Sequence, residues 1–148
     1  MKIGDPAPDF ELQANTGENV KLSNYFGKKK IILFFYVKDN TLGCTAEVIG
    51  FRDNYAKISE NYEILGINND SNNSHINFSQ KHKLPFKLLS DPRKKIASLY
   101  DAKGTLGMYT KRITYLIGLD GKIEKIIDGM GAGPHLEFVS NLQAWNYL

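Results

Sequence analysis

The feature that most constrains the fold is the run at residues 30–37, in which every residue after the first lysine is apolar or aromatic. β-Branched and aromatic residues dominate the run, and no polar residue interrupts it. A short, continuous apolar segment of this kind is typical of a central strand that is buried on both faces of a sheet. The run therefore favours a sheet with covering layers on each side.

Periodicity and turn residues predict the other elements. Alternation on either side of Asp120-Gly121 indicates a β-hairpin over residues 113–117 and 123–127. Further short strands are expected at residues 9–12 and 19–22, around a turn at Thr16-Gly17, and at residues 63–68 and 86–89. Helices are expected over about residues 44–60 and 71–82, from Pro92 to Tyr100, and from Pro134 through a face carrying Leu136, Val139, Leu142 and Trp145.

This order of elements predicts the fold class. A βαβ unit followed, after one insertion, by a ββα unit is the thioredoxin-like plan. We expect an α/β protein with a mixed central sheet, helices on both faces and an N-terminal β-hairpin extension. A chain of 148 residues suits a single domain, over residues 1–148.

Composition excludes several classes of function. The net charge is only +3, and the sole basic run, Lys28–Lys30, is expected to be a solvated loop, so nucleic-acid binding is not expected. No stretch approaches the ~18 apolar residues of a membrane helix, and the N-terminus lacks the apolar segment of a signal peptide, so we expect a cytoplasmic protein. The histidines, His75, His82 and His135, lack metal-ligand spacing and are expected at the surface or at helix caps. No metal or other cofactor is expected.

Cys44, the only cysteine, is the candidate reactive residue. A lone cysteine is more often an inert small apolar residue, but Cys44 follows a polar loop at the carboxyl end of the central strand, where open α/β sheets place reactive groups. It also lies in the first turn of a helix, where free N–H groups favour a thiolate. Thr41 can hydrogen-bond the sulfur or an oxygen bound near it, and Gly43 allows close backbone approach. Cys44 is expected to lie off the apolar stripe of its helix.

The residues Thr41-Leu42-Gly43-Cys44-Thr45, followed by Glu47, closely resemble the active-site loop of peroxiredoxins of the AhpC/TSA superfamily. The closest match is the Q-type branch, also called bacterioferritin comigratory protein. The other matching stretches cover nearly the whole chain in order: residues 4–12, 34–39, 84–86, 89–92 and 112–117. The resemblance implies a peroxidatic cysteine at Cys44, catalytic partners at Thr41 and Arg112, and supporting roles for Glu47 and Gly43. Without it, Arg112 would be interpreted as a surface residue at a strand edge.

Two positions depart from the family pattern. Val37 occupies the place of the family proline, and Ile49 that of the resolving cysteine carried by many Q-type members. The resemblance therefore implies a one-cysteine antioxidant cycle, in which the Cys44 thiolate reduces hydrogen peroxide or organic hydroperoxides and becomes a sulfenic acid. An external thiol would regenerate it: thioredoxin, glutaredoxin with glutathione, or a small thiol. A monomer or weak homodimer is expected.

Two alternatives remain open at this stage. A non-catalytic or redox-sensing module could have kept the fold and lost turnover, as the changes at Val37 and Ile49 suggest. A thiol-disulfide oxidoreductase is less well supported, because Glu47 stands where a Cys-x-x-Cys motif would need its second cysteine. The pH at which Cys44 ionises would separate an inert module from a peroxidase.

Overall fold

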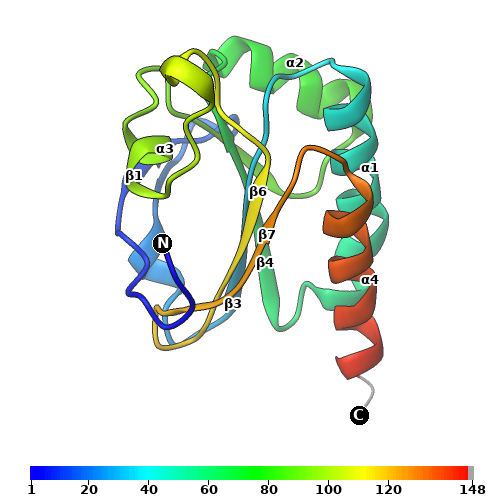
Figure 1. Cartoon of the computed structure of the whole chain (residues 1–148). Helices are drawn as coiled ribbons and strands as arrows, with labels where there is room; N and C mark the ends of the chain where they lie inside the picture. Colours follow the sequence, from blue (N-terminus) through cyan, green and yellow to red (C-terminus); the bar gives the residue numbers. More distant parts are fainter. Residues whose placement is uncertain (147–148) are drawn as a thin grey trace.

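The computed structural model describes residues 1–146, with side chains described as far as Leu142 (Figure 1). Its elements are β1 (Glu11–Gln13), β2 (Asn19–Lys21), the 3-10 turn η1 (Leu22–Tyr25), β3 (Lys30–Phe35), α1 (Leu42–Ile58), β4 (Tyr62–Asn68), α2 (Asn72–His82), β5 (Lys87–Ser90), α3 (Lys95–Leu99), η2 (Thr105–Gly107), β6 (Ile113–Ile117), β7 (Ile123–Asp128) and α4 (Gly133–Asn146).

The main sheet has the strand order β5-β4-β3-β6-β7. β3 pairs in parallel with β4, and β4 with β5, whereas β6 runs antiparallel to both β3 and β7. β1 and β2 form a separate antiparallel hairpin, whose turn contains Gly17 at a φ of +89°. The expected α/β class, with a mixed central sheet and an N-terminal hairpin, is confirmed.

β3 divides the interior into two cores. Ile31, Leu33 and Phe35 pack into one core with the β1–β2 hairpin and α3, and the alternate residues of β3 pack into the other with α1, α2 and α4. Figure 1 shows α1 and α4 side by side on one side of the sheet, with α3 and β1 on the other. The expected burial of this strand on both faces, with helices on both faces of the sheet, is confirmed.

The start of α3 differs from the expectation at Pro92. The helix begins at Lys95, because Lys94 has a left-handed backbone conformation with a φ of +55°. The carboxylate of Asp91 accepts hydrogen bonds from the first backbone N–H groups of the helix, including those of Lys95 and Ala97. A side-chain cap placed four residues before the helix therefore fixes its start, and Pro92 lies in the turn before it.

Three smaller expectations have different outcomes. α1 begins two residues before Cys44, at Leu42. Of the basic run, only Lys28 is fully exposed, since Lys29 donates to the Ser59 carbonyl at 2.6 Å and Lys30 pairs with a glutamate across the sheet. The expected contact of Trp145 lies outside the described side chains. In the part of the chain that is described, no helix has the length and apolar character needed to cross a membrane.

Candidate active site

Cys44 is the third residue of α1, just beyond the carboxyl end of β3. Its backbone N–H is one of the helix's first donors, which have no partner within the helix and which favour negative charge nearby. The expectation that Cys44 lies off the apolar stripe is wrong. Its side chain is 1% exposed and shares the buried face of α1 with Val48 and Phe51, at helical spacings of four and seven residues. The cysteine is thus inside the protein, at the positive end of its helix.

Arg112 reaches Cys44 from the residue just before β6. Its Nη2 donates to the sulfur at 3.3 Å, its Nη1 to Glu47 Oε1 at 2.6 Å, and its Nε to the carbonyl of Met130 at 2.8 Å. The side chain is buried. Since all three nitrogens are held, the guanidinium has one fixed orientation, and its permanent charge favours a thiolate over a thiol.

The close approach of Arg112 to the first turn of α1 leaves little room for a side chain at Gly43. A Cβ at position 43 would lie 3.1 Å from Arg112 Nη2, which is tighter than ordinary contact. The glycine therefore leaves room for the guanidinium above the first turn of α1, as expected of a position where backbone and site come close.

Glu47 lies one turn after Cys44 on the same face of α1 and is fully buried. Burial raises the pKa of Glu47 to about 7, although the charge of Arg112 acts in the opposite direction. Oε1 accepts from Arg112, while the buried Oε2 has no hydrogen-bond partner among the side chains described up to Leu142. His135 Nδ1 lies 3.7 Å from Oε2.

His135, from the first turn of α4, was missed as a site residue, and the expectation that it lies at the surface is wrong. It is fully buried. Its Nε2 faces the Gly129 carbonyl at 2.9 Å, and its Nδ1 faces the Thr114 hydroxyl at 2.7 Å. The sequence contained a signal: His135 stands three and four residues before the buried Phe138 and Val139, so it shares the apolar stripe of its helix.

His75 was also expected at the surface and is instead buried beneath the loop that leads to Cys44. Its Nδ1 lies 2.8 Å from Asp39 Oδ2 and its Nε2 lies 3.1 Å from the Leu89 carbonyl. Burial would raise the pKa of Asp39, but hydrogen bonds from His75, Tyr36 and Ser74 outweigh it and lower that pKa. This cluster ties the loop that precedes Cys44 to α2. Only His82 is partly exposed, near the end of α2, as expected.

Thr41 occupies the N-cap position of α1 and is exposed. Its hydroxyl donates to the carbonyl of Lys38 at 2.9 Å, and not to the sulfur of Cys44. This bond uses the hydroxyl proton and leaves the oxygen lone pairs free to accept. Val37, in the place of the family proline, is half-buried and packs against the core that contains Cys44.

The comparisons with known proteins agree with this geometry. A family model described as "AhpC/TSA family" matches residues 3–126. The chain belongs to the AhpC/TSA family. Peroxiredoxin Bcp of Bacillus subtilis (strain 168) is 43% identical over 132 residues, which cover 84% of this chain and 83% of that protein.

Two solved structures support the assignment to this AhpC/TSA branch. The peroxidoxin BcpB of Mycobacterium tuberculosis has a TM-score of 0.88 at 31% identity over 97% of each chain. The bacterioferritin comigratory protein of Xanthomonas campestris, described with its alkyl peroxide reduction activity, has a TM-score of 0.83 at 26% identity, over 91% of this chain and 90% of that one. The resemblance to Q-type peroxiredoxins is confirmed, and it supports a thiol peroxidase that acts on hydroperoxides with a thiol reductant.

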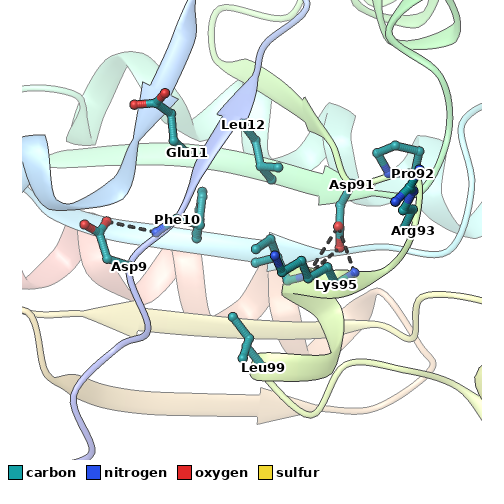
Figure 2. Close-up of a pocket in the computed structure, with 10 residues that line it drawn as sticks. Asp9, Phe10, Glu11, Leu12, Asp91, Pro92, Arg93, Lys95 and Leu99 are labelled. Carbon is teal, nitrogen blue, oxygen red and sulfur yellow. Dashed lines mark hydrogen bonds between the residues drawn. The ribbon is translucent and has the colours of Figure 1, made fainter.

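A pocket of about 390 Å³ lies away from this site, between β1 and α3 (Figure 2). Phe10 and Ile96 in its lining belong to the core on the opposite face of the sheet from Cys44. The one fully buried carboxylate in the lining, Asp91, already accepts the N–H groups that start α3. The pocket is therefore separate from the cluster of Cys44, Glu47 and Arg112, and its buried carboxylate is used to start α3.

Proposed function

We propose that this protein reduces hydrogen peroxide and organic hydroperoxides through Cys44 alone and is regenerated by an external thiol. The observation that carries the proposal is the 3.3 Å contact between Arg112 Nη2 and Cys44 Sγ, at the N-terminus of α1. A fixed cation and a helix N-terminus at one buried sulfur both favour the thiolate, which is the nucleophile.

The chemical step exchanges one bond for another. The Cys44 thiolate attacks the terminal oxygen of the hydroperoxide, the S–O bond forms as the O–O bond breaks, and the transferred OH makes a sulfenic acid. Sulfur is oxidised and the peroxide is reduced, and the leaving alkoxide or hydroxide takes a proton from water. Arg112 stabilises the charge that spreads over the oxygens. Thr41, whose proton is used at Lys38, accepts a hydrogen bond from the peroxide OH.

Regeneration then takes two external thiols. The first condenses with the sulfenic acid, releasing water and leaving a mixed disulfide at Cys44, and the second releases the Cys44 thiolate as a new disulfide forms. Because Cys44 is the only cysteine in the sequence, no second cysteine of the same chain can take part. Since its side chain is 1% exposed, a bulky thiol reaches it only after the first turn of α1 moves outward.

The proposed substrates include organic hydroperoxides as well as hydrogen peroxide. The Xanthomonas campestris relative is described with alkyl peroxide reduction activity. In this chain the residues beside the reacting pair, Leu42 before Gly43-Cys44 and Met130 at Arg112, are both large, apolar and more than half exposed. Apolar side chains at these positions suit the alkyl part of an organic hydroperoxide.

The test is peroxide consumption by the wild-type protein with thioredoxin, with glutaredoxin and glutathione, and with dithiothreitol, beside a Cys44→Ser control. We expect the wild type to consume peroxide with at least one of these reductants and the control to consume none. Mass spectrometry of the oxidised protein after addition of glutathione should show one glutathione adduct at Cys44. Equal peroxide loss in both proteins would exclude the peroxidase, and peroxide loss without any thiol adduct would exclude this route of regeneration.

A further inference from the structure

The donors and acceptors around His135 and Glu47 do not match in the usual way. The Nε2 of His135 faces the Gly129 carbonyl, which only accepts, so Nε2 carries a hydrogen. In a neutral ring Nδ1 then has a lone pair, which accepts from the Thr114 hydroxyl. Glu47 Oε2 lies 3.7 Å from the same Nδ1, and within the described part of the chain no group donates a hydrogen bond to it.

An ionised carboxylate oxygen with no donor is costly inside a protein. Two arrangements remove that cost here. Glu47 can be a neutral acid that carries its proton on Oε2, beside a neutral His135, or Glu47 can be a carboxylate facing a His135 imidazolium. Both arrangements hold one proton in the pair and leave it with no net charge. The Arg112 cation and the Cys44 thiolate then balance each other within the same buried cluster.

Arg112 connects this pair to the sulfur, because Nη1 contacts Glu47 and Nη2 contacts Cys44. We propose that Glu47 and His135 hold one shared proton, and that this proton determines how much of the Arg112 charge is available to the Cys44 thiolate. Without the proton, the Glu47 carboxylate competes with the thiolate for the guanidinium. His135 is thus a positioning residue that acts through Glu47, and the inference rests on Cys44 being the reactive thiolate of the proposed function.

The other charged groups around His135 do not replace this proton. Asp128, at the end of β7, favours a charged His135 ring, but Asp128 pairs with Lys111 at 3.4 Å. Burial is the largest effect on His135 and lowers its pKa, and the charge of Arg112 acts in the same direction. Burial thus opposes the charged form of both groups, because it raises the pKa of Glu47 to about 7 and lowers the pKa of His135.

The test measures the pH midpoint of Cys44 alkylation by iodoacetamide, followed by intact mass, which needs no peroxide turnover. In His135→Asn the amide N–H can donate to Glu47 Oε2, which stabilises the carboxylate over the neutral acid, so Glu47 stays ionised and opposes the thiolate. We expect the midpoint to rise by about one pH unit, a tenfold change in thiolate fraction at a given pH. In a Glu47→Gln background, where no carboxylate remains, the same His135→Asn change should move the midpoint by less than about 0.2.

His82→Asn is the matched control, because it removes a histidine at the far end of α2, and it should leave the midpoint unchanged. All variants should share one midpoint in urea, where the pair does not exist. An equal shift of the midpoint in both backgrounds would show that His135 acts without Glu47 and would overturn the proposal. So would the absence of a shift in the wild-type background. If the protein did not consume peroxide, the proposed function would be contradicted, but the pH midpoint of Cys44 alkylation would still test the shared proton.

A second measurement covers the case in which His135→Asn does not fold. Two-bond ¹H–¹⁵N NMR reports the protonation of both ring nitrogens of each histidine in the folded wild type. We expect the His135 nitrogens to titrate in the wild type and to keep a neutral ring protonated at Nε2 in Glu47→Gln above pH 6. Identical titration of His135 in both proteins would overturn the shared proton.

Discussion

Replacing Glu47 with glutamine should raise the free energy of unfolding relative to that of the protein with Glu47, and this advantage should grow as the pH rises. The pKa of Glu47 is raised from 4.5 to about 7 by burial, so the folded state holds the proton more tightly than the unfolded chain does. The sign follows: folding stability is greatest when the carboxyl is protonated, and it is lost as the pH rises from about 4.5 to about 7. At about 1.4 kcal/mol per pKa unit, the loss between pH 5 and pH 8 is about 2 to 3 kcal/mol.

Glutamine keeps an oxygen for Arg112 and carries no charge, so the variant should lack this loss. The assay is urea unfolding followed by circular dichroism at pH 5 and pH 8, with both proteins carrying Cys44→Ser so that no thiol titrates. The stability difference between the two proteins should shift by about 2 to 3 kcal/mol in favour of glutamine at the higher pH. A difference that stays constant within about 0.5 kcal/mol would show that the buried carboxyl is not the group that titrates.

Three further changes test the surrounding framework. Gly43→Ala places a methyl group 3.1 Å from Arg112 Nη2, so peroxide reduction should slow by roughly tenfold or more while the melting temperature changes little. A normal rate of peroxide reduction would show that the guanidinium has room to move. Gly66→Ala, in the middle of β4, would place a Cβ within 3 Å of two buried side chains and should cost about 1 to 3 kcal/mol in urea unfolding. Asp39→Asn removes the carboxylate beside the buried His75 and should cost about 3 kcal/mol at pH 7, whereas a loss below about 1 kcal/mol would mean that the pair contributes little to folding.

Most of the fold could be predicted because it depends on periodicity. Residues 31–36 alternate between the two cores, and the 3.6-residue repeats indicated the helices that cover them. The boundary that was missed, the start of α3, depends on a side-chain cap and on a left-handed residue at Lys94. Local sequence gave no sign that a lysine would adopt that conformation, and a first-turn proline at position 92 was the better local interpretation.

The site, like the fold, combines residues that local sequence patterns predict with a contact between segments that lie far apart in the sequence. Cys44 could be predicted from its place after the central strand, and Glu47 lies one turn further along the same helix. Arg112 contacts them across 65 residues or more of sequence, so no spacing rule could place it, and only the family resemblance did. The buried position of Cys44 was missed because position in the first turn was taken to mean distance from the apolar stripe, although Val48 and Phe51 share its face.

The two misplaced histidines show where sequence reasoning should be adjusted. A histidine is often at least partly exposed, and this prior placed His75 and His135 at the surface. Both stand three residues before a buried phenylalanine on their helix, so the stripe already placed them inside. A polar residue at a stripe position must find partners when it is buried. His75 Nδ1 lies 2.8 Å from Asp39, and His135 Nδ1 lies 2.7 Å from the Thr114 hydroxyl and 3.7 Å from Glu47. A histidine that breaks the apolar pattern of a helix is therefore a better indicator of a buried ionisable site than its type alone suggests.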